Sequence, residues 1–124
     1  PIVWEGLVAR ERIPEIDRSA HLLFSADLNA ACPNAAIEAL ACGLPVVAFD
    51  TGALPELVPS EAGRVVPYGG DPWVLDPPDL EGLARAAAEI VRAGEGLREG
   101  ARLRAEAAFG LEGMVEGYVR AQLC

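Results

Sequence analysis

The sequence predicts an α/β protein in which a parallel β-sheet is covered by helices on both faces. Short apolar runs of strand length, such as HLLF at residues 21–24 and PVVAF at 45–49, alternate with segments of helical spacing. The second run is uninterrupted, which is typical of a strand buried on both faces of a parallel sheet. This alternation predicts βαβ units with right-handed crossovers.

The first predicted elements occupy the N-terminal segment. PIVW at residues 1–4 is a short β-like run, and it is followed by Glu5 and Gly6. The second half of ARERIPEIDRSA, residues 9–20, predicts a helix, because its isoleucines lie three residues apart and a proline is tolerated in a first turn. HLLF then predicts a strand that ends at the polar SADLN.

A short helix is predicted over residues 35–42. Asn34 can cap its start, and Gly43 and Pro45 mark its end. The apolar strand PVVAF follows at once. After it, DTGALPELV at residues 50–58 contains turn residues and one predicted helical turn.

The next strand is predicted at GRVVPY, residues 63–68, and a loop rich in Gly, Pro and Asp follows at 69–79. Asp79 can cap a helix over residues 80–93. The apolar face of that helix would consist of Leu83, Ala86, Ala87 and Ile90.

The C-terminal part predicts two more helices. The glycines of GEGLREG, residues 94–100, predict a break, and helices follow at about 101–109 and 111–123. The last helix carries an apolar stripe, so it either packs on its own domain, docks elsewhere or pairs with another copy. Arginines are expected to balance glutamates on the solvated helix faces nearby, with Arg98, Arg102 and Arg104 beside Glu95, Glu99 and Glu106.

Length and composition predict a single α/β domain over residues 1–124. The formal net charge is -9, and all ten basic residues are arginines. An acidic surface repels nucleic acids and anionic lipids, so neither is an expected partner. Because the sequence opens on Pro1 rather than Met, it is expected to be a piece of a longer chain.

The cysteines predict no disulfide framework. Cys32, Cys42 and Cys124 are odd in number and irregularly spaced, and they are expected to be small buried or terminal thiols. No Cys/His cluster indicates a metal site. No signal peptide or run long enough to span a bilayer is visible, so a cytoplasmic location is expected.

The predicted site lies at the carboxyl ends of the strands, where parallel sheets bind ligands. The helix that begins after Asn34 offers unpaired backbone N–H groups and the positive end of its dipole to a phosphate. Glu38 lies one turn further along and could accept two hydrogen bonds from the paired hydroxyls of a sugar. Alternatively, Glu38 is an ordinary solvated helix residue.

Several motifs support a resemblance to a known family. EALACGLPVV at residues 38–47 is the most specific of them. PELV at 55–58, GRVV at 63–66 and the Asp79-Leu80 pair follow in the expected order. The sequence from about residue 3 to residue 92 resembles the donor-binding C-terminal domain of GT-B-fold retaining glycosyltransferases, in particular family 4, the group 1 transferases.

The resemblance implies a Rossmann-like domain that binds the nucleotide-sugar donor, of UDP or GDP type. It implies that Glu38 holds the ribose and that the backbone around Cys32, Pro33 and Asn34 faces the sugar and diphosphate. Gly6 would lie near the phosphates. The loop of Thr51, Gly52 and Ala53 would close the same crevice. No metal or other cofactor is implied, and the acceptor would bind a separate N-terminal domain.

Three departures from the family pattern leave the catalytic residues unassigned. Ala30 occupies the position of the family's first acid, eight residues before Glu38. The Arg and Lys that neutralise the diphosphate lie upstream in the family, and Arg10 and Arg12 do not match them. Cations at a leaving diphosphate supply a large part of catalysis, so the chain alone is expected to transfer sugar poorly.

Two alternatives to a catalytic donor domain remain open. One is a non-catalytic binding or assembly module of the same ancestry, which Ala30 favours. The other is a flavodoxin-like or receiver-like interaction domain, which would need an acidic cluster or flavin loop that the sequence lacks. Trp73 and Tyr68 either form a lid or partner contact or anchor their own loop, and Asp50 is interpreted as a strand-end residue.

Overall fold

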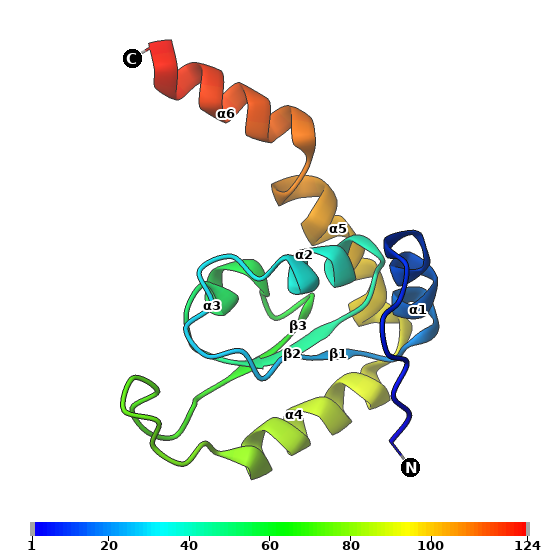
Figure 1. The fold of residues 1–124 in the computed structure, drawn as a ribbon, viewed down its shortest axis with the longest axis vertical. Coiled ribbons are helices and arrows are strands. Elements are labelled where there is room, and N and C mark those ends of the chain that lie inside the picture. The colour runs from blue at the N-terminus through cyan, green and yellow to red at the C-terminus, as the bar shows by residue number, and fades with distance from the viewer. Residues whose placement is uncertain (1, 124) are drawn as a thin grey trace.

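The computed structural model describes residues 2–123 and contains a parallel sheet of three strands in the order β1-β2-β3. The strands are β1 (Leu23–Phe24), β2 (Val46–Phe49) and β3 (Gly63–Val66). Leu23 aligns with Val46, and Val46 aligns with Gly63. The predicted α/β class is therefore confirmed, and all three strands end at one edge of the sheet (Figure 1).

Helices cover both faces of this sheet (Figure 1). On one face lie α2 (Asn34–Ala41), the single turn α3 (Leu54–Leu57) and most of α5 (Glu95–Ala108). On the other face lies α4 (Leu80–Ala93), which packs against β2 and β3. The short helix α1 (Ile13–Ser19) packs beside α2, preceded by the 3₁₀ turn η1 (Arg10–Arg12).

Strand β2 divides the core in two. Val46 and Ala48 belong to the cluster under α2 and α5, whereas Val47 and Phe49 belong to the cluster under α4. All four β2 residues are buried, as the uninterrupted apolar run predicted. Burying one Val or Phe side chain stabilises a fold by about 1.5–3 kcal/mol. Since β2 contributes buried side chains to both halves of the core, it is the central element of the fold.

The predicted strand at PIVW does not form in the described residues. Ile2, Val3 and Trp4 have no regular structure and are exposed, and Pro1 lies outside the described residues. An apolar run becomes a strand only when a neighbour satisfies its backbone hydrogen bonds, and residues 2–4 pair with none of the three strands.

Helix α2 begins one residue earlier than predicted. Asn34 is its first residue, and Pro33 occupies the N-cap position without a side-chain hydrogen bond, so the predicted Asn34 cap is wrong. Proline has a fixed φ and no side-chain acceptor, which leaves the start of the helix uncapped. The helix ends at Ala41, one residue before the predicted end, and Gly43 follows its C-cap Cys42 with φ +69°, as expected for a glycine after a helix.

Helix α4 has the predicted bounds. The Asp79 Oδ1 atom accepts a hydrogen bond from the Gly82 backbone at 2.8 Å, which confirms the predicted cap. Leu83, Ala86 and Ile90 are buried, and Ala87 is partly buried. The Asp79 cap and the spacing of the apolar residues were therefore sufficient to predict α4.

Helix α5 contradicts the predicted break at residues 94–100, because it begins at Glu95. Leu97 and Ala101 are buried one turn apart, and Gly100 lies against the backbone of Glu61. Packing thus outweighs the low helix propensity of glycine.

The arginines of α5 do more than balance glutamates. Arg102 forms the expected i,i+4 pair with Glu106 at 2.7 Å. Arg98, in contrast, donates to the carbonyls of Ala20 and Arg18, at 2.8 and 3.0 Å. Arg104 donates to the carbonyls of Glu56 and Leu57, at 2.6 and 3.3 Å, so these two arginines join α5 to distant loops.

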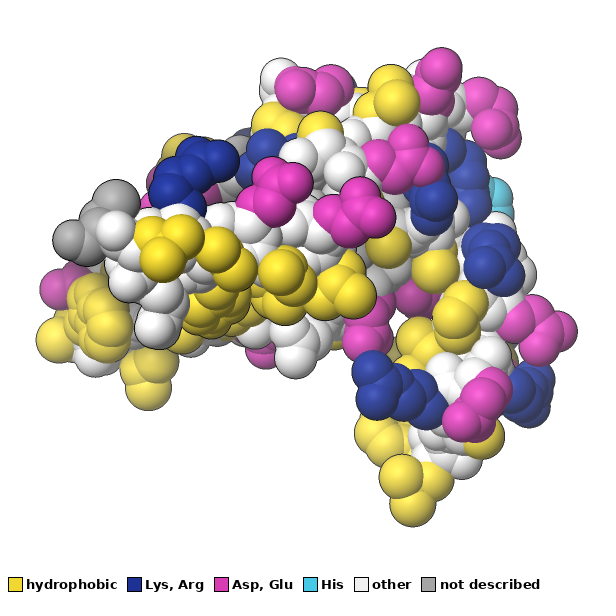
Figure 2. Space-filling view, turned by 90° about the horizontal axis from the view of Figure 1, so that it is seen from above, with side chains coloured by type: hydrophobic (Ala, Val, Ile, Leu, Met, Phe, Trp, Pro, Cys, Tyr) yellow, Lys and Arg dark blue, Asp and Glu magenta, His cyan; other side chains and the backbone are white. Residues whose placement is uncertain are grey.

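The last helix, α6 (Leu111–Leu123), projects from the body of the molecule (Figure 1). All of its residues are exposed. In the view from above, hydrophobic side chains form a band over this part of the molecule (Figure 2). They include Leu111, Met114, Val115, Tyr118 and Val119. The predicted apolar stripe of α6 is therefore not covered by any other part of residues 2–123.

Two remaining sequence expectations concern thiols and membrane spans. Cys32 is exposed rather than buried, Cys42 is half-buried, and Cys124 lies outside the described residues. In the part of the chain that the structure describes, no helix combines the length and the apolar character that crossing a bilayer requires.

Candidate functional site

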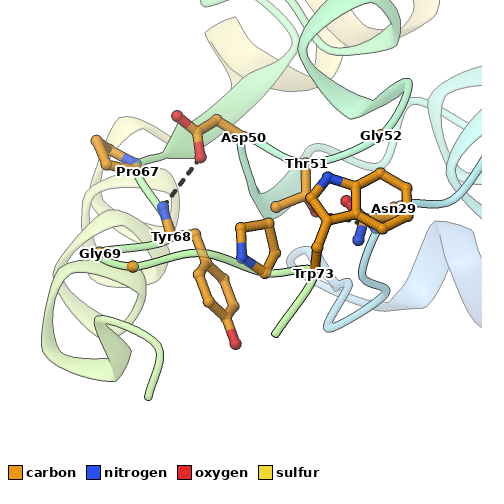
Figure 3. Close-up of a pocket in the computed structure, with 10 residues that line it drawn as sticks. Asn29, Asp50, Thr51, Gly52, Pro67, Tyr68, Gly69 and Trp73 are labelled. Atoms are coloured by element: carbon orange, nitrogen blue, oxygen red, sulfur yellow. Dashed lines mark hydrogen bonds between the residues drawn. The ribbon is translucent and has the colours of Figure 1, made fainter. Parts of the chain in front are cut away.

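A cavity of about 470 Å³ lies where the strands end, between the loops that follow β1, β2 and β3 (Figure 3). Its lining residues are Asn29, Asp50, Thr51, Gly52, Pro67, Tyr68, Gly69, Gly70, Pro72 and Trp73. Because carboxyl ends of parallel strands are the usual ligand edge of such sheets, this cavity is a candidate functional site.

The loops after β1 and β2 are joined to each other. The Thr51 hydroxyl accepts from the Asn29 backbone N–H and donates to the Asp27 carbonyl, both at 3.4 Å. The Ala53 N–H donates to the Ala30 carbonyl at 2.8 Å. Thr51 is buried, so its hydroxyl serves this connection.

Gly52 makes the close approach of these loops possible. It has φ +57°, and a Cβ atom there would lie 2.4 Å from the carbonyl oxygen of Ala30. Both the left-handed backbone and the contact exclude a side chain at this position.

The loops after β2 and β3 are also joined. Asp50 Oδ1 accepts from the Tyr68 backbone N–H at 2.9 Å (Figure 3). The Tyr68 ring packs edge-on against Phe49, with centroids 5.2 Å apart, and its hydroxyl donates to the Asp76 carbonyl at 2.6 Å. Tyr68 therefore anchors its own loop, which was one of the two interpretations of the sequence.

Trp73 belongs to an ordered turn although 78% of it is exposed. Its backbone N–H donates to Asp71 Oδ1 at 2.9 Å. The Asp71 N–H donates to Asp76 Oδ2 at 2.9 Å, and the Asp76 N–H donates to the Asp71 carbonyl at 3.1 Å. The indole thus lines the cavity from a turn held by its own hydrogen bonds (Figure 3).

Glu38 lines a different, smaller cavity of about 230 Å³ between α1 and α2. The other lining residues are Arg10, Ile13, Pro14, Asp17 and Cys42. Burial raises the pKa of Asp17, and the negative charge of Glu38 raises it further. Burial likewise raises the pKa of the Cys42 thiol, with Asp17 as the next cause. This cavity combines one cation with two carboxyl groups.

The structure distributes the eight predicted donor-binding residues over several places. Thr51 and Gly52 line the larger cavity, and Ala53 follows them. Cys32, Pro33 and Asn34 lie at the start of α2, with Pro33 buried.

The remaining two predicted donor-binding residues lie elsewhere. Glu38 is exposed on α2 and lines the smaller cavity. Gly6 is exposed in the N-terminal segment, with open space around its Cα. Neither Glu38 nor Gly6 shares a cavity with Thr51 and Gly52, and all eight donor-binding roles stay predictions.

Sequence reasoning did not assign Asn29 or Arg10 to a cavity. Asn29 has φ +55°, a conformation that Asn tolerates better than most residues, but nothing in the sequence placed its side chain near Trp73. Arg10 lines the same cavity as Glu38 because η1 packs against α1, which lies beside α2. Within residues 2–123, no group of three His, Cys, Asp or Glu side chains could hold a metal ion.

Comparisons with known proteins agree with this architecture. A family model described as glycosyl transferases group 1 matches residues 1–93. Among solved structures, the sucrose-phosphate synthase from Thermosynechococcus elongatus is similar, with 28% sequence identity and a TM-score of 0.77. That match covers 95% of this chain and 29% of that chain. No curated protein matches the sequence.

The family match covers β1, β2, β3 and α4, and thus the whole sheet and all three loops that line the larger cavity. The structural match extends over nearly the whole chain and shows the Rossmann-like architecture of part of a GT-B glycosyltransferase. Sequence motifs, sheet topology and both comparisons lead to one conclusion: this chain belongs to the group 1 glycosyltransferases.

Proposed function

We propose that this chain is the donor-binding part of a retaining, family 4 glycosyltransferase that moves a sugar from a UDP- or GDP-type nucleotide-sugar to an acceptor. Membership of the group 1 family supports glycosyl transfer in general. The observation that carries the finer proposal is the position of Glu38: an exposed carboxylate one turn along α2, on the rim of a cavity.

The start of α2 supports a role in binding the diphosphate. In residues 2–123, the first backbone N–H groups of α2, those of Asn34 and Ala35, donate to no backbone acceptor. Such groups and the helix dipole favour an anion. In this proposal the backbone from Cys32 to Asn34 contacts the sugar and diphosphate, and Thr51, Gly52, Ala53 and Gly6 complete the crevice.

Glu38 is proposed to bind the ribose. An ionised carboxylate accepts hydrogen bonds from two neighbouring hydroxyl groups. Arg10 lines the same cavity and can offset part of the negative charge that Asp17 and Glu38 bring to it. The proposed site needs no metal or other cofactor.

Nucleotide titration tests this proposal. UDP, GDP and ADP are titrated by calorimetry into the chain and into its Glu38→Gln variant. We expect Glu38→Gln to weaken the preferred nucleotide about tenfold or more, because hydrogen bonds to a charged group contribute about 1.5–3 kcal/mol. Glu116→Gln is the matched control: it makes the same chemical change on exposed α6. Equal weakening by both variants, or no binding at millimolar concentrations, would contradict the proposal.

A non-catalytic binding or assembly module is the second candidate, and Ala30 favours it. The methyl side chain of Ala30 cannot act as the family's first acid, and its backbone carbonyl is used by Ala53. Introducing Ala30→Asp into a two-domain protein distinguishes the two. A gain in sugar transfer would favour a weakened enzyme, and unchanged activity would favour the module.

The proposal extends to partners and location. We propose an N-terminal acceptor-binding domain as partner, with α6 docking against it or against a second copy of this chain. The apolar, unpacked face of α6 supports this. Nucleic acid is not proposed as a partner, because the net charge is -9. A cytoplasmic location, where nucleotide-sugars are available, fits the same function.

A further inference from the structure

A cavity lined by arginines lies beside the amino ends of the strands, where α1, α2 and α5 come together, at the opposite edge of the sheet from the larger cavity (Figure 1). Its volume is about 430 Å³, within the usual range for small-molecule sites of about 300–1,000 Å³. Arg18 comes from α1, and Arg98 and Arg102 come from α5. Three cations thus line this arginine cavity in a chain whose net charge is -9.

Two of the three arginines are held in place by backbone carbonyls. Arg98 donates to the carbonyls of Ala20 and Arg18, at 2.8 and 3.0 Å. Arg102 donates to the Ala41 carbonyl and, at 2.7 Å, to a glutamate of its own helix. Within residues 2–123 these contacts use two of the five N–H donors of each guanidinium, so three of each are left for a ligand. Side chains that are already fixed lose less entropy when a ligand binds.

The third arginine, Arg18, is not used by the fold. In the part of the chain that the structure describes, its guanidinium forms neither a hydrogen bond nor an ion pair. Glu95 and Glu99 also line the cavity, but neither forms an ion pair with an arginine of residues 2–123. Three arginines and two glutamates leave one excess positive charge, so an anion would meet guanidinium groups that the lining carboxylates do not neutralise.

Cys42 shows that the charges of different helices converge here. Burial is the main cause that raises the pKa of its thiol, and Asp17 raises it further, whereas Arg18 and Arg102 both lower it. Arg18 lies on α1, Arg102 lies on α5, and Cys42 follows α2. Positive charges from two helices therefore act at the end of a third.

We propose that the arginine cavity binds a small phosphate-bearing anion. The planar fork of a guanidinium matches the spacing of phosphate oxygens and donates two parallel hydrogen bonds to them. Arg18 would contribute the donors that the fold does not use, and Arg98 and Arg102 would contribute their remaining ones.

This inference does not rest on the proposed nucleotide site. Cys42 lines both the arginine cavity and the Glu38 cavity, but none of the three arginines lines the Glu38 cavity. The proposed diphosphate contacts lie at the start of α2, whereas Cys42 follows its end. A ligand at one end of α2 can therefore be distinguished from a ligand at the other.

A dicarboxylate is the main rival ligand, because arginine forks also bind carboxylates. Glu95 and Glu99 repel either anion, and the ligand must outweigh that repulsion. A phosphate monoester brings about two negative charges and three acceptor oxygens on one group, which favours it over a carboxylate. Succinate, whose two charges lie on separate carboxylates, is therefore included as a probe.

Thiol labelling tests the proposal in the unaltered chain. The chain is labelled with iodoacetamide at increasing concentrations of pyrophosphate, and sodium chloride keeps the ionic strength constant. Peptide fragmentation in a mass spectrometer measures the labelling of Cys42 and Cys32 separately. We expect pyrophosphate at millimolar concentrations to slow the labelling of Cys42 saturably, by about twofold or more, because the bound anion offsets the arginines and lowers the thiolate fraction.

Substitution of Arg18 tests which groups bind the anion. Arg18→Gln should raise the pyrophosphate concentration needed for protection about tenfold, because hydrogen bonds to a charged ligand are lost. Arg18→Lys keeps the charge but not the fork and should recover part of the loss. Arg120→Gln, the matched control, makes the same change of charge on exposed α6 and should have no effect. Each variant is compared with its own labelling rate without pyrophosphate, and circular dichroism checks that it is folded.

The proposal is overturned if pyrophosphate does not slow the labelling of Cys42, if Arg18→Gln and Arg120→Gln have equal effects, or if succinate protects Cys42 as well as pyrophosphate does. Slower labelling of Cys32 alone would place the anion at the start of α2, which would overturn this inference but not the proposed nucleotide site. Conversely, Glu38→Gln should leave the protection of Cys42 intact even where nucleotide binding is lost.

Discussion

Gly52 illustrates how much of the site depends on a single residue. Its left-handed backbone and its contact with Ala30 allow the loops after β1 and β2 to touch. We expect Gly52→Ala to destabilise the chain by about 2 kcal/mol or more, because it combines backbone strain with a steric clash against backbone atoms. Urea unfolding measures this change.

Gly96→Ala is the matched control for Gly52→Ala. Gly96 lies in α5, and a Cβ atom there would meet nothing within 4 Å. The same substitution should therefore stabilise the chain by about 0.5–1 kcal/mol, through helix propensity alone. If both variants lost equal stability, the described contact with Ala30 would not be the cause.

Asp17 gives stability a dependence on pH. Burial and the nearby Glu38 raise its pKa above the ordinary value of 3.8, so the folded chain binds its proton more tightly than the unfolded chain does. The contribution of Asp17 to the free energy of unfolding is therefore greatest at a pH below the pKa of Asp17 in the unfolded chain. It falls as the pH rises through the pKa of Asp17 in the folded chain. We expect Asp17→Asn to be more stable than the parent chain at neutral pH, with the difference vanishing below about pH 4.

Urea unfolding from pH 3 to pH 8 checks this sign. Glu38→Gln should reduce the pH dependence without abolishing it, because burial is the larger cause of the raised pKa. An Asp17→Asn variant that gained stability only at low pH would contradict the assignment.

Among the elements, α4 shows what a local capping signal contributes. The Asp79 side chain satisfies the Gly82 N–H at the start of the helix. We expect Asp79→Ala to lower the free energy of unfolding by about 1 kcal/mol, as is usual for an N-cap. Asp79→Ser retains a side-chain acceptor and should recover most of this loss in the same unfolding measurement; if it does not, the cap is not the cause.

At the scale of whole elements, local signals predicted the fold well and tertiary contacts caused the misses. Three local signals predicted where elements begin or end: Asp79 before α4, Gly43 after α2, and the apolar run at residues 45–49 for β2. Each of these signals acts only on residues next to it in the sequence. The early start of α5 depended on Gly100 meeting Glu61, which lies far away in sequence. The strand expected at residues 1–4 lacked a neighbour, which no local pattern reveals.

The candidate site was predictable only in part, for the same reason. The rule for strand ends placed Thr51 and Gly52 at the correct edge of the sheet. The position of Trp73 depends on the hydrogen bond between Asp50 and Tyr68 and on the turn from Asp71 to Asp76. Those contacts join residues whose proximity the sequence does not encode locally.

For the whole molecule, α6 stands apart from the α/β body. Its residues are exposed, so substitutions on its apolar face should not weaken the fold. We expect the double variant Val115→Ser, Val119→Ser to change the free energy of unfolding of the body by no more than about 0.5 kcal/mol. If α6 mediates self-association as proposed, sedimentation should show that the same variant dissociates at higher protein concentrations than the parent chain.

The connection made by Thr51 has a further consequence. Its hydroxyl ties the segment leading into α2 to the rim of the larger cavity, so a shift of one loop should be passed on to the other. A ligand that ordered either loop should therefore favour the ordered state of the other, and by thermodynamic reciprocity that coupling would be equal in both directions. Thr51→Val removes this tie, and we expect it to speed hydrogen exchange at the Asn29 backbone N–H, which donates to the Thr51 hydroxyl in the parent chain.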